Sequence, residues 1–130
     1  AGYPGNVADA LGEPVLNIAA ASKDFERALP IVKALVEGGA STSLTSFSGG
    51  ETSLMKACVA GNAGVVRYLV EEAKADINAT NNRGDTALHI AGFWGHIEIV
   101  KFLLAAGANV MIRNIEHKLP GQDFDEIFPK

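Results

Sequence analysis

Three stretches of this chain repeat one pattern of apolar and polar positions. Residues 31–36, 65–70 and 99–104 each carry apolar side chains at the first, second, fifth and sixth positions. On a helix with 3.6 residues per turn these positions form a single stripe, and the polar side chains fall on the opposite face. Each stretch therefore predicts an amphipathic helix with one buried side.

A second, shorter pattern precedes each of these stretches. It is Leu-x-x-Ala with a glycine four positions before the leucine, and it begins at Leu16, Leu54 and Leu88. Glycine suits a turn that needs a positive φ angle just before a helix. Thr52 and Thr86 stand where an N-cap hydroxyl can accept a hydrogen bond from the first turn of that helix. The chain is therefore expected to fold into consecutive pairs of helices.

The most complete copy of the pattern lies between Asn81 and Asn114, which are 33 residues apart. Within it, residues 86–91 read Thr-Ala-Leu-His-Ile-Ala. This segment differs at one position from Thr-Pro-Leu-His-x-Ala, the hexapeptide of the ankyrin repeat, whose period is about 33 residues. The chain thus resembles the ankyrin-repeat family, over residues 9–120. The resemblance implies an all-α solenoid of stacked units, each a hairpin-like loop followed by two antiparallel helices.

The copies divide the chain into units of unequal regularity. Corresponding positions recur after 38, 34 and 33 residues, at Asp9, Phe47, Asn81 and Asn114. The first unit has about four extra residues between its helices, and Pro30 is expected in the first turn of its second helix. The terminal units of such arrays are usually atypical. The expected division is an irregular lead-in at 1–8, a degenerate N-terminal capping repeat at 9–46 with an insertion at 22–29, a second repeat at 47–80, a third at 81–113, and a partial fourth repeat at 114–130, whose Phe124, Ile127 and Phe128 form a C-terminal cap.

Composition and net charge argue against some classes of binding partner. The chain has 130 residues, of which 48% are apolar, and a net charge of −4, which suits one folded domain or about four repeat units. A negative chain has no general attraction to nucleic acid or to anionic membranes, which call for basic surfaces. No apolar run reaches the roughly 18 residues of a membrane span. We therefore expect no nucleic acid and no membrane as partner. The resemblance implies protein partners, and we expect a monomer.

The cysteine content points to a compartment. Cys58 is the single cysteine, so no disulfide can form within the chain, which fits a reducing environment. The expected location is intracellular and cytoplasmic, with the nucleus left open. Cys58 falls on the first helix of the second unit, where we expect a buried, unreactive thiol with no cationic neighbour on its helix face. The chain begins with Ala1 rather than methionine, which leaves flanking domains open.

His89 and His96 invite a metal-site hypothesis, because a spacing of seven residues could place both on one helical face. Gly95 lies between them and ends the first helix, and no Cys-x-x-Cys or His-Glu-x-x-His accompanies them. In the ankyrin family this first histidine hydrogen-bonds backbone and the threonine of a neighbouring unit, and the resemblance gives His89 that role. The glycine-rich stretch 48–50 lacks the Lys-Ser/Thr end of a phosphate loop. We therefore expect no catalytic residue, no metal, no cofactor and no enzyme activity.

Partner contacts are expected where the ankyrin family carries its variable residues, in the loops and at the end of each first helix. Phe93 and Trp94 end the first helix of the third unit, and Trp and Arg are favoured at the centres of protein interfaces. Packing against the adjacent unit is the alternative role for this aromatic pair. Transferred position by position, the expected contact residues are Trp94, Phe93, Arg83, Asn82 and Asp85 in the third unit and Ser48, Glu51, Val59 and Ala60 in the second.

These features favour a protein-binding module, a scaffold or regulator, that uses its concave loop-and-first-helix surface and performs no catalysis. Trp94 and Arg83 are expected at the centre of the contact, with Glu51 and Asp85 adding specificity at its rim. Two alternatives stay open. The chain could be an accessory domain that positions substrate in a larger enzyme, or an assembly chaperone or inhibitor that covers a partner's surface. Fold alone does not choose among them.

Overall fold

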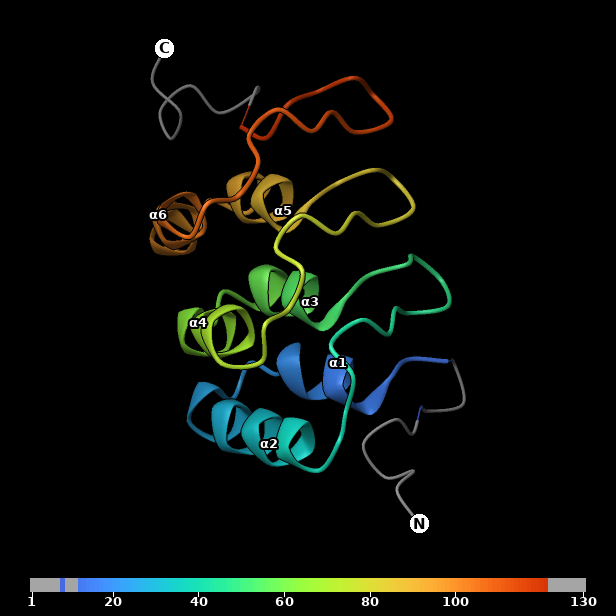
Figure 1. Ribbon diagram of the computed structural model, residues 1–130, viewed down its shortest axis with the longest axis vertical. Coiled ribbons are helices and arrows are strands. Elements are labelled where there is room, and N and C mark those ends of the chain that lie inside the picture. Colours follow the sequence, from blue (N-terminus) through green and yellow to red (C-terminus); the bar gives the residue numbers. More distant parts are fainter. Residues whose placement is uncertain (1–7, 9–11, 122–130) are drawn as a thin grey trace.

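The computed structural model describes Ala8 and residues 12–121 of the chain, and this part contains six helices in two layers (Figure 1). Within each layer, every helix packs against the corresponding helix of the neighbouring pair, and the two helices of a pair pack against each other. The protein is therefore an all-α solenoid, as predicted. One layer contains α1 (Val15–Ala20), α3 (Ser53–Ala60) and α5 (Ala87–Phe93), and the other contains α2 (Phe25–Glu37), α4 (Ala63–Glu71) and α6 (Ile97–Ala105).

The segments that join successive pairs project as long loops from the layer of α1, α3 and α5, all on the same side (Figure 1). Strand-like pairing in the described part of the chain is confined to an isolated antiparallel bridge between Ala8 and Pro14. The loops thus form a third row beside the two helical layers.

Threonine caps start the first helices of the second and third pairs, as predicted. The Thr52 side chain accepts a hydrogen bond from the backbone N–H of Met55, and the Thr86 side chain accepts one from the N–H of His89. The glycine four positions before each leucine has a positive φ angle, between 66° and 79°. The local signals in the sequence therefore place the start of α3 and of α5.

The core follows the two apolar patterns of the sequence. Ala57 in α3 and Ala91 in α5 are fully buried, and their small side chains let neighbouring helices approach closely. Around them lie leucines from both layers that are at most 1% exposed, so the two patterns fill one continuous core. These leucines are Leu16, Leu54, Leu69, Leu88 and Leu103.

The second helix of the first pair is longer than predicted. Residues 25–29 belong to α2, so Pro30 lies inside the helix rather than in its first turn, and most of the predicted insertion at 22–29 is helical. The cause is Asp24, whose side chain caps the helix by accepting a hydrogen bond from the Arg27 N–H at 3.4 Å. Pro30 is exposed and removes one backbone hydrogen bond. A proline more often marks a helix start, which is why the pattern pointed to the wrong boundary.

Backbone hydrogen bonds define equivalent positions in the loops. The Ser46 N–H donates to the Glu51 carbonyl at 2.9 Å, as the Asn81 N–H does to the Asp85 carbonyl at 3.0 Å. The loop that starts at Ser46 is therefore one residue longer, and it carries Phe47, whose side chain is 86% exposed. Ser46 takes the place of Asn81, one residue before the predicted start of the second repeat. The repeat boundaries themselves stay predictions.

Contacts between cations and aromatic rings link the helices of the second layer. Lys33 Nζ in α2 lies 5.8 Å from the ring centre of Tyr68 in α4, and Arg67 Cζ in α4 lies 4.9 Å from that of Phe102 in α6. Such contacts contribute about 0.5–1 kcal/mol each at exposed positions. They add to the apolar packing that joins each pair of helices to the next.

Two of the sequence predictions concern segments that the structure does not describe. Residues 1–7 of the expected lead-in lie outside the described residues, and so do Phe124, Ile127 and Phe128 of the expected C-terminal cap. Among the helices that are described, none has the length and apolar character needed to cross a membrane.

Candidate binding surface

A groove of about 510 Å³ runs past all three helix pairs on the side where the loops project. Its lining comes from residues that follow α1, from the C-terminal ends of α3 and α5, and from the loops before α3, before α5 and after α6. The groove therefore lies on the loop-and-first-helix surface where partner contacts are expected.

Most of the predicted contact residues meet in this groove. Asn82 and Ser48 are exposed but lie outside its lining, and Ala60 lies inside it although it is only 5% exposed. Ala60 thus forms part of the groove floor. The part that these residues play in binding stays a prediction. The predicted residues that line the groove are Trp94, Phe93, Arg83, Asp85, Glu51, Val59 and Ala60.

Phe93 and Trp94 form an exposed aromatic pair at the end of α5. Their ring centres are 5.6 Å apart and their planes are at 84°, an edge-to-face arrangement. Phe93 is 66% exposed and Trp94 is 55% exposed, whereas Gly92 just before them is buried. The helix ends here because Gly95 adopts a φ of 72°, which turns the chain toward α6. More than half of the surface of each residue is therefore exposed, and both residues line the groove.

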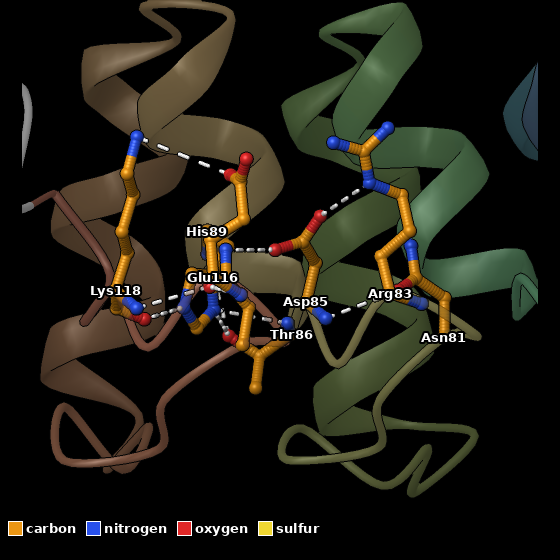
Figure 2. A network of polar contacts seen from close by, with 8 residues as sticks. Asn81, Arg83, Asp85, Thr86, His89, Glu116 and Lys118 are labelled. Carbon is orange, nitrogen blue, oxygen red and sulfur yellow. Dashed lines mark hydrogen bonds and ion pairs between the residues drawn. The ribbon is translucent and has the colours of Figure 1, made fainter.

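His89 holds the start of α5 and ties it to the following loop (Figure 2). Its Nδ1 accepts a hydrogen bond from the Thr86 N–H at 3.0 Å and lies 2.9 Å from Thr86 Oγ1. Because a backbone N–H can only donate, Nδ1 is the acceptor, and Nε2 donates to the Lys118 carbonyl at 3.0 Å. One part of the resemblance was wrong, since Thr86 belongs to the same unit as His89 and the link to the next unit runs through the Lys118 carbonyl.

His96 makes a separate structural contact. Its Nε2 lies 3.3 Å from the Val59 carbonyl in the preceding pair, and its side chain makes no cap at the start of α6. Gly95 separates His96 from α5, as predicted, and both ring nitrogens of His89 already have protein partners. The two histidines therefore hold neighbouring units together rather than facing each other across one site.

Asparagine side chains hydrogen-bond within the loops beside α5 and connect one loop to the next, and Figure 2 shows Asn81 among them. Asn81 Oδ1 accepts hydrogen bonds from the Arg83 N–H at 2.9 Å and the Asp85 N–H at 3.0 Å. In the next loop Asn114 uses its Oδ1 in the same way, and its Nδ2 donates to Asp85 Oδ1 at 2.8 Å. The Ile115 N–H donates to the Arg83 carbonyl at 2.8 Å. Adjacent loops therefore have a fixed register along the groove.

Lys56 in the groove lining pairs with two carboxylates. Its Nζ lies 2.9 Å from Glu51 and 3.2 Å from Glu13. Burial lowers the pKa of Lys56, but the hydrogen bonds and charges of Glu51 and Glu13 outweigh burial, so the pKa lies above its usual value. Glu51, expected at the rim of the contact, is thus held by an internal partner.

Comparison with known proteins assigns the fold to a family. A family profile described as ankyrin repeats matches residues 6–114 in three copies. The chain belongs to the ankyrin-repeat family. Ankyrin repeats generally mediate protein–protein interaction and are generally non-catalytic.

Curated relatives of this ankyrin-repeat chain are mostly much longer proteins. The chain is 32% identical over 106 residues to the nuclear factor NF-kappa-B p105 subunit of Mus musculus, which covers 82% of the chain and 11% of that protein. It is 45% identical over 58 residues to palmitoyltransferase akr1 of Schizosaccharomyces pombe, which covers 45% and 9%. It is 44% identical over 55 residues to the Notch-regulated ankyrin repeat-containing protein A of Danio rerio, which covers 42% and 48%. The chain therefore spans at most about half the length of these relatives.

Cys58 is buried inside this ankyrin stack, as predicted. Its side chain has no exposed surface, and burial raises the pKa of its thiol to about 12. At pH 8 roughly one thiol in ten thousand is then ionised. We expect iodoacetamide to leave the native protein unlabelled over hours and to label the urea-unfolded protein rapidly, as measured by intact mass. Native-state labelling at the rate of free glutathione would contradict this prediction.

The sequence did not single out several groove residues. Lys23 follows α1 in the stretch that the sequence predicts to be an insertion, and its Nζ lies 3.5 Å from the Ala60 carbonyl. Glu116, Lys118 and Leu119 also line the groove, and they belong to the partial fourth unit that the sequence predicts to be a cap. A comparison of equivalent loop positions could have found Glu116 and Lys118, because they align with Arg83 and Asp85 through the shared asparagine turn. No local signal marks Lys23.

Proposed function

We propose that this ankyrin-repeat chain binds a partner protein in the groove, with Trp94 and Phe93 at the centre of the contact. The observation that carries this proposal is the edge-to-face aromatic pair, more than half exposed and set in the groove wall. Exposed apolar patches rimmed by polar residues often mark interaction sites. Arg83 adds an exposed guanidinium, and Trp and Arg are the residues most often found at the centre of interfaces.

The energy available from the aromatic pair is sufficient for an anchor. Covering the exposed parts of both rings removes on the order of 200 Å² of apolar surface from water, which contributes roughly 5 kcal/mol before the cost of association. The ion pairs along the groove contribute less, because exposed pairs are each worth about 0–1 kcal/mol. Binding strength should therefore depend mainly on the two rings, and the charges should govern selectivity.

Trp94→Ala is expected to weaken partner binding by about 2 kcal/mol, or roughly thirtyfold, while leaving the helix content unchanged. The ring is more than half exposed, so its loss opens no cavity in the core. The measurement is affinity capture of partners from cell extract by the wild-type and variant chains, followed by titration of the partner against both. Circular dichroism checks the fold.

Phe47→Ala is a matched control, because Phe47 is the more exposed aromatic side chain and lies outside the groove. It should leave partner binding within about twofold of wild type. Equal binding by wild type and Trp94→Ala would show that the groove is not the contact surface. Unfolding of Trp94→Ala would instead assign Trp94 to the packing between units.

A second candidate function is that of an accessory domain that positions substrate for a larger enzyme. It is favoured by the match to a stretch of palmitoyltransferase akr1 that makes up 9% of that protein. Determining the length of the natural gene product distinguishes the two functions, since an accessory domain requires a catalytic domain in the same polypeptide. A chaperone or inhibitor role predicts a single stoichiometric complex in the capture experiment.

The proposal also covers the cellular location and the oligomeric state of the chain. We expect the chain to act as a monomer inside the cell, in the cytoplasm or the nucleus, and to take no nucleic acid or membrane as partner. The single buried cysteine fits a reducing compartment. Sedimentation velocity at micromolar concentration tests the monomer, and a species of twice the mass of the chain would contradict it.

A further inference from the structure

The groove lining has a net positive charge, whereas the whole chain has a net negative charge. The lining has four cations and three carboxylates, a net charge of +1, and since the whole chain carries −4, the positions outside the groove together carry −5. The positive excess therefore coincides with the exposed aromatic pair. The charged lining residues are Lys23, Lys56, Arg83, Lys118, Glu51, Asp85 and Glu116.

Two of the three groove carboxylates already have close partners. Glu51 lies 2.9 Å from the ammonium group of Lys56. Asp85 accepts a hydrogen bond from the Asn114 side chain at 2.8 Å through Oδ1, and its Oδ2 lies 3.8 Å from Arg83 Nε. A ligand with cationic groups would have to displace these partners. The groove is therefore poorly suited to a basic segment.

Two of the groove cations retain unused donors. Arg83 contacts Asp85 through Nε alone, its side chain is 70% exposed, and its two terminal nitrogens have no acceptor among the described residues. Lys23 Nζ meets one long contact, 3.5 Å to the Ala60 carbonyl, and no carboxylate of the described chain lies within 4.0 Å of it. Both side chains can therefore donate hydrogen bonds to a carboxylate of a ligand while they keep their existing contacts.

The position of Lys23 sets a spacing from the aromatic pair. Ala60 at the end of α3 and Trp94 just after α5 hold equivalent places on neighbouring helices, so their backbones are about one helix packing distance apart, roughly 8–10 Å. Lys23 Nζ lies 3.5 Å from the Ala60 carbonyl. An extended segment with three residues per turn rises about 3.1 Å per residue and returns to the same side every third residue. Side chains three positions apart on such a segment can therefore reach both sites.

We propose that the groove binds an extended segment of the partner that carries a bulky apolar side chain and an acidic side chain three positions from it. The apolar side chain covers Phe93 and Trp94, and the carboxylate pairs with Lys23. A further carboxylate on the segment pairs with the terminal nitrogens of Arg83. This assignment rests on the proposed function, since it names the kind of partner that the same groove accepts.

Single-stranded nucleic acid also combines negative charge with planar groups that stack on aromatic rings. It fits this groove less well, because the groove lining has a net charge of only +1 and the rest of the chain carries a net −5. A polyanion needs a longer track of cations, and a chain of net negative charge repels it. A protein segment with two carboxylates needs only the two groove cations Lys23 and Arg83.

The test is selection of nine-residue peptides displayed on phage against the immobilised wild-type chain. The expected result is enrichment of Asp or Glu three positions from Leu, Phe, Trp or Met. For the best synthetic peptide, Lys23→Glu should raise the dissociation constant at least tenfold, and replacing the peptide's acidic residue by lysine should restore binding to that variant. Lys101→Glu is the matched control, since Lys101 is exposed on α6 outside the groove, and it should change the dissociation constant less than twofold.

Three results would overturn the proposed segment. The first is selection of peptides without acidic residues, or equal affinity of the acidic peptide for wild type and Lys23→Glu. The second is the absence of any selected peptide while a captured partner protein still depends on Trp94, which keeps the proposed function and points to a folded partner surface. The third is tighter binding of a twelve-nucleotide oligothymidylate, lost in Trp94→Ala, which assigns the groove to nucleic acid. If neither peptide nor protein binding depends on Trp94, the proposed function fails as well.

Discussion

Gly84→Ala is expected to lower the free energy of unfolding by about 3 kcal/mol, measured by urea denaturation. Gly84 has a φ of 77°, a conformation that costs a residue with a side chain about 1–2 kcal/mol. A Cβ atom there would lie 3.0 Å from Asn114 Cα and 3.1 Å from the Ile115 nitrogen. Both are backbone atoms of the next loop, so the loops must separate, which adds roughly 1–3 kcal/mol.

His117 provides the control for this substitution. It takes the same turn position in the last described loop, with a φ of 62°, and its side chain is exposed. His117→Gly relieves the backbone conformation but gives the unfolded chain more freedom, so the two effects oppose each other and the net change should stay below about 1 kcal/mol. A loss of less than 1 kcal/mol for Gly84→Ala would show that the close approach of the two loops does not stabilise the fold.

His89→Ala is expected to cost about 3 kcal/mol of stability. The imidazole accepts from the buried Thr86 N–H and donates to the Lys118 carbonyl, so its removal loses about 1 kcal/mol for each hydrogen bond and leaves a buried N–H without an acceptor. The expected signature is a lower urea midpoint, with faster amide exchange in the loop after α6. This substitution acts on the junction between units and should leave the first helix pair intact.

His89→Asn should recover about half of that loss. Asn17 is buried at the corresponding place in α1, and its Nδ2 donates to the Glu51 carbonyl at 2.9 Å, so an asparagine can make the contact to the next loop. It has no equivalent of the contact to the Thr86 N–H, because Pro14 stands there in the first unit and has no N–H. If His89→Asn is as unstable as His89→Ala, the link to the following loop contributes little.

The helix pairs could be predicted because several local signals agree at each start. Thr86 caps α5, the preceding glycine turns the chain, and Leu88 and Ala91 fall on the buried face. The boundary of α2 was predicted wrongly because two signals conflict there, and the Asp24 cap takes precedence over the proline. Sequence patterns fail where two local signals conflict, because the strength of each signal depends on burial and on neighbouring residues.

The groove was predictable in part. The family pattern pointed to Trp94 and Arg83 by their positions in one unit, and both line it. The positive excess could not be predicted, because it depends on which charged residues of different units come together in the groove lining. Lys23 reaches the groove from a different helix pair, and Asp85 is engaged by Asn114 of the following loop. Such pairings arise from stacking and leave no trace in local sequence.

The groove is lined by residues from all three helix pairs, whereas each helix pair packs only against its immediate neighbours. Helix packing joins α1 to α3, α3 to α5, α2 to α4 and α4 to α6, and stability in such an array is a sum of unit terms and nearest-neighbour terms. The ends of the free protein should therefore fray independently of each other. A segment lying along the groove would contact the first and third helix pairs at once and would couple their stabilities. Binding would then slow amide hydrogen exchange in the helix pairs at both ends of the stack, including positions far from the bound side chains. It would also make the helix pairs unfold in one concerted transition instead of one after another.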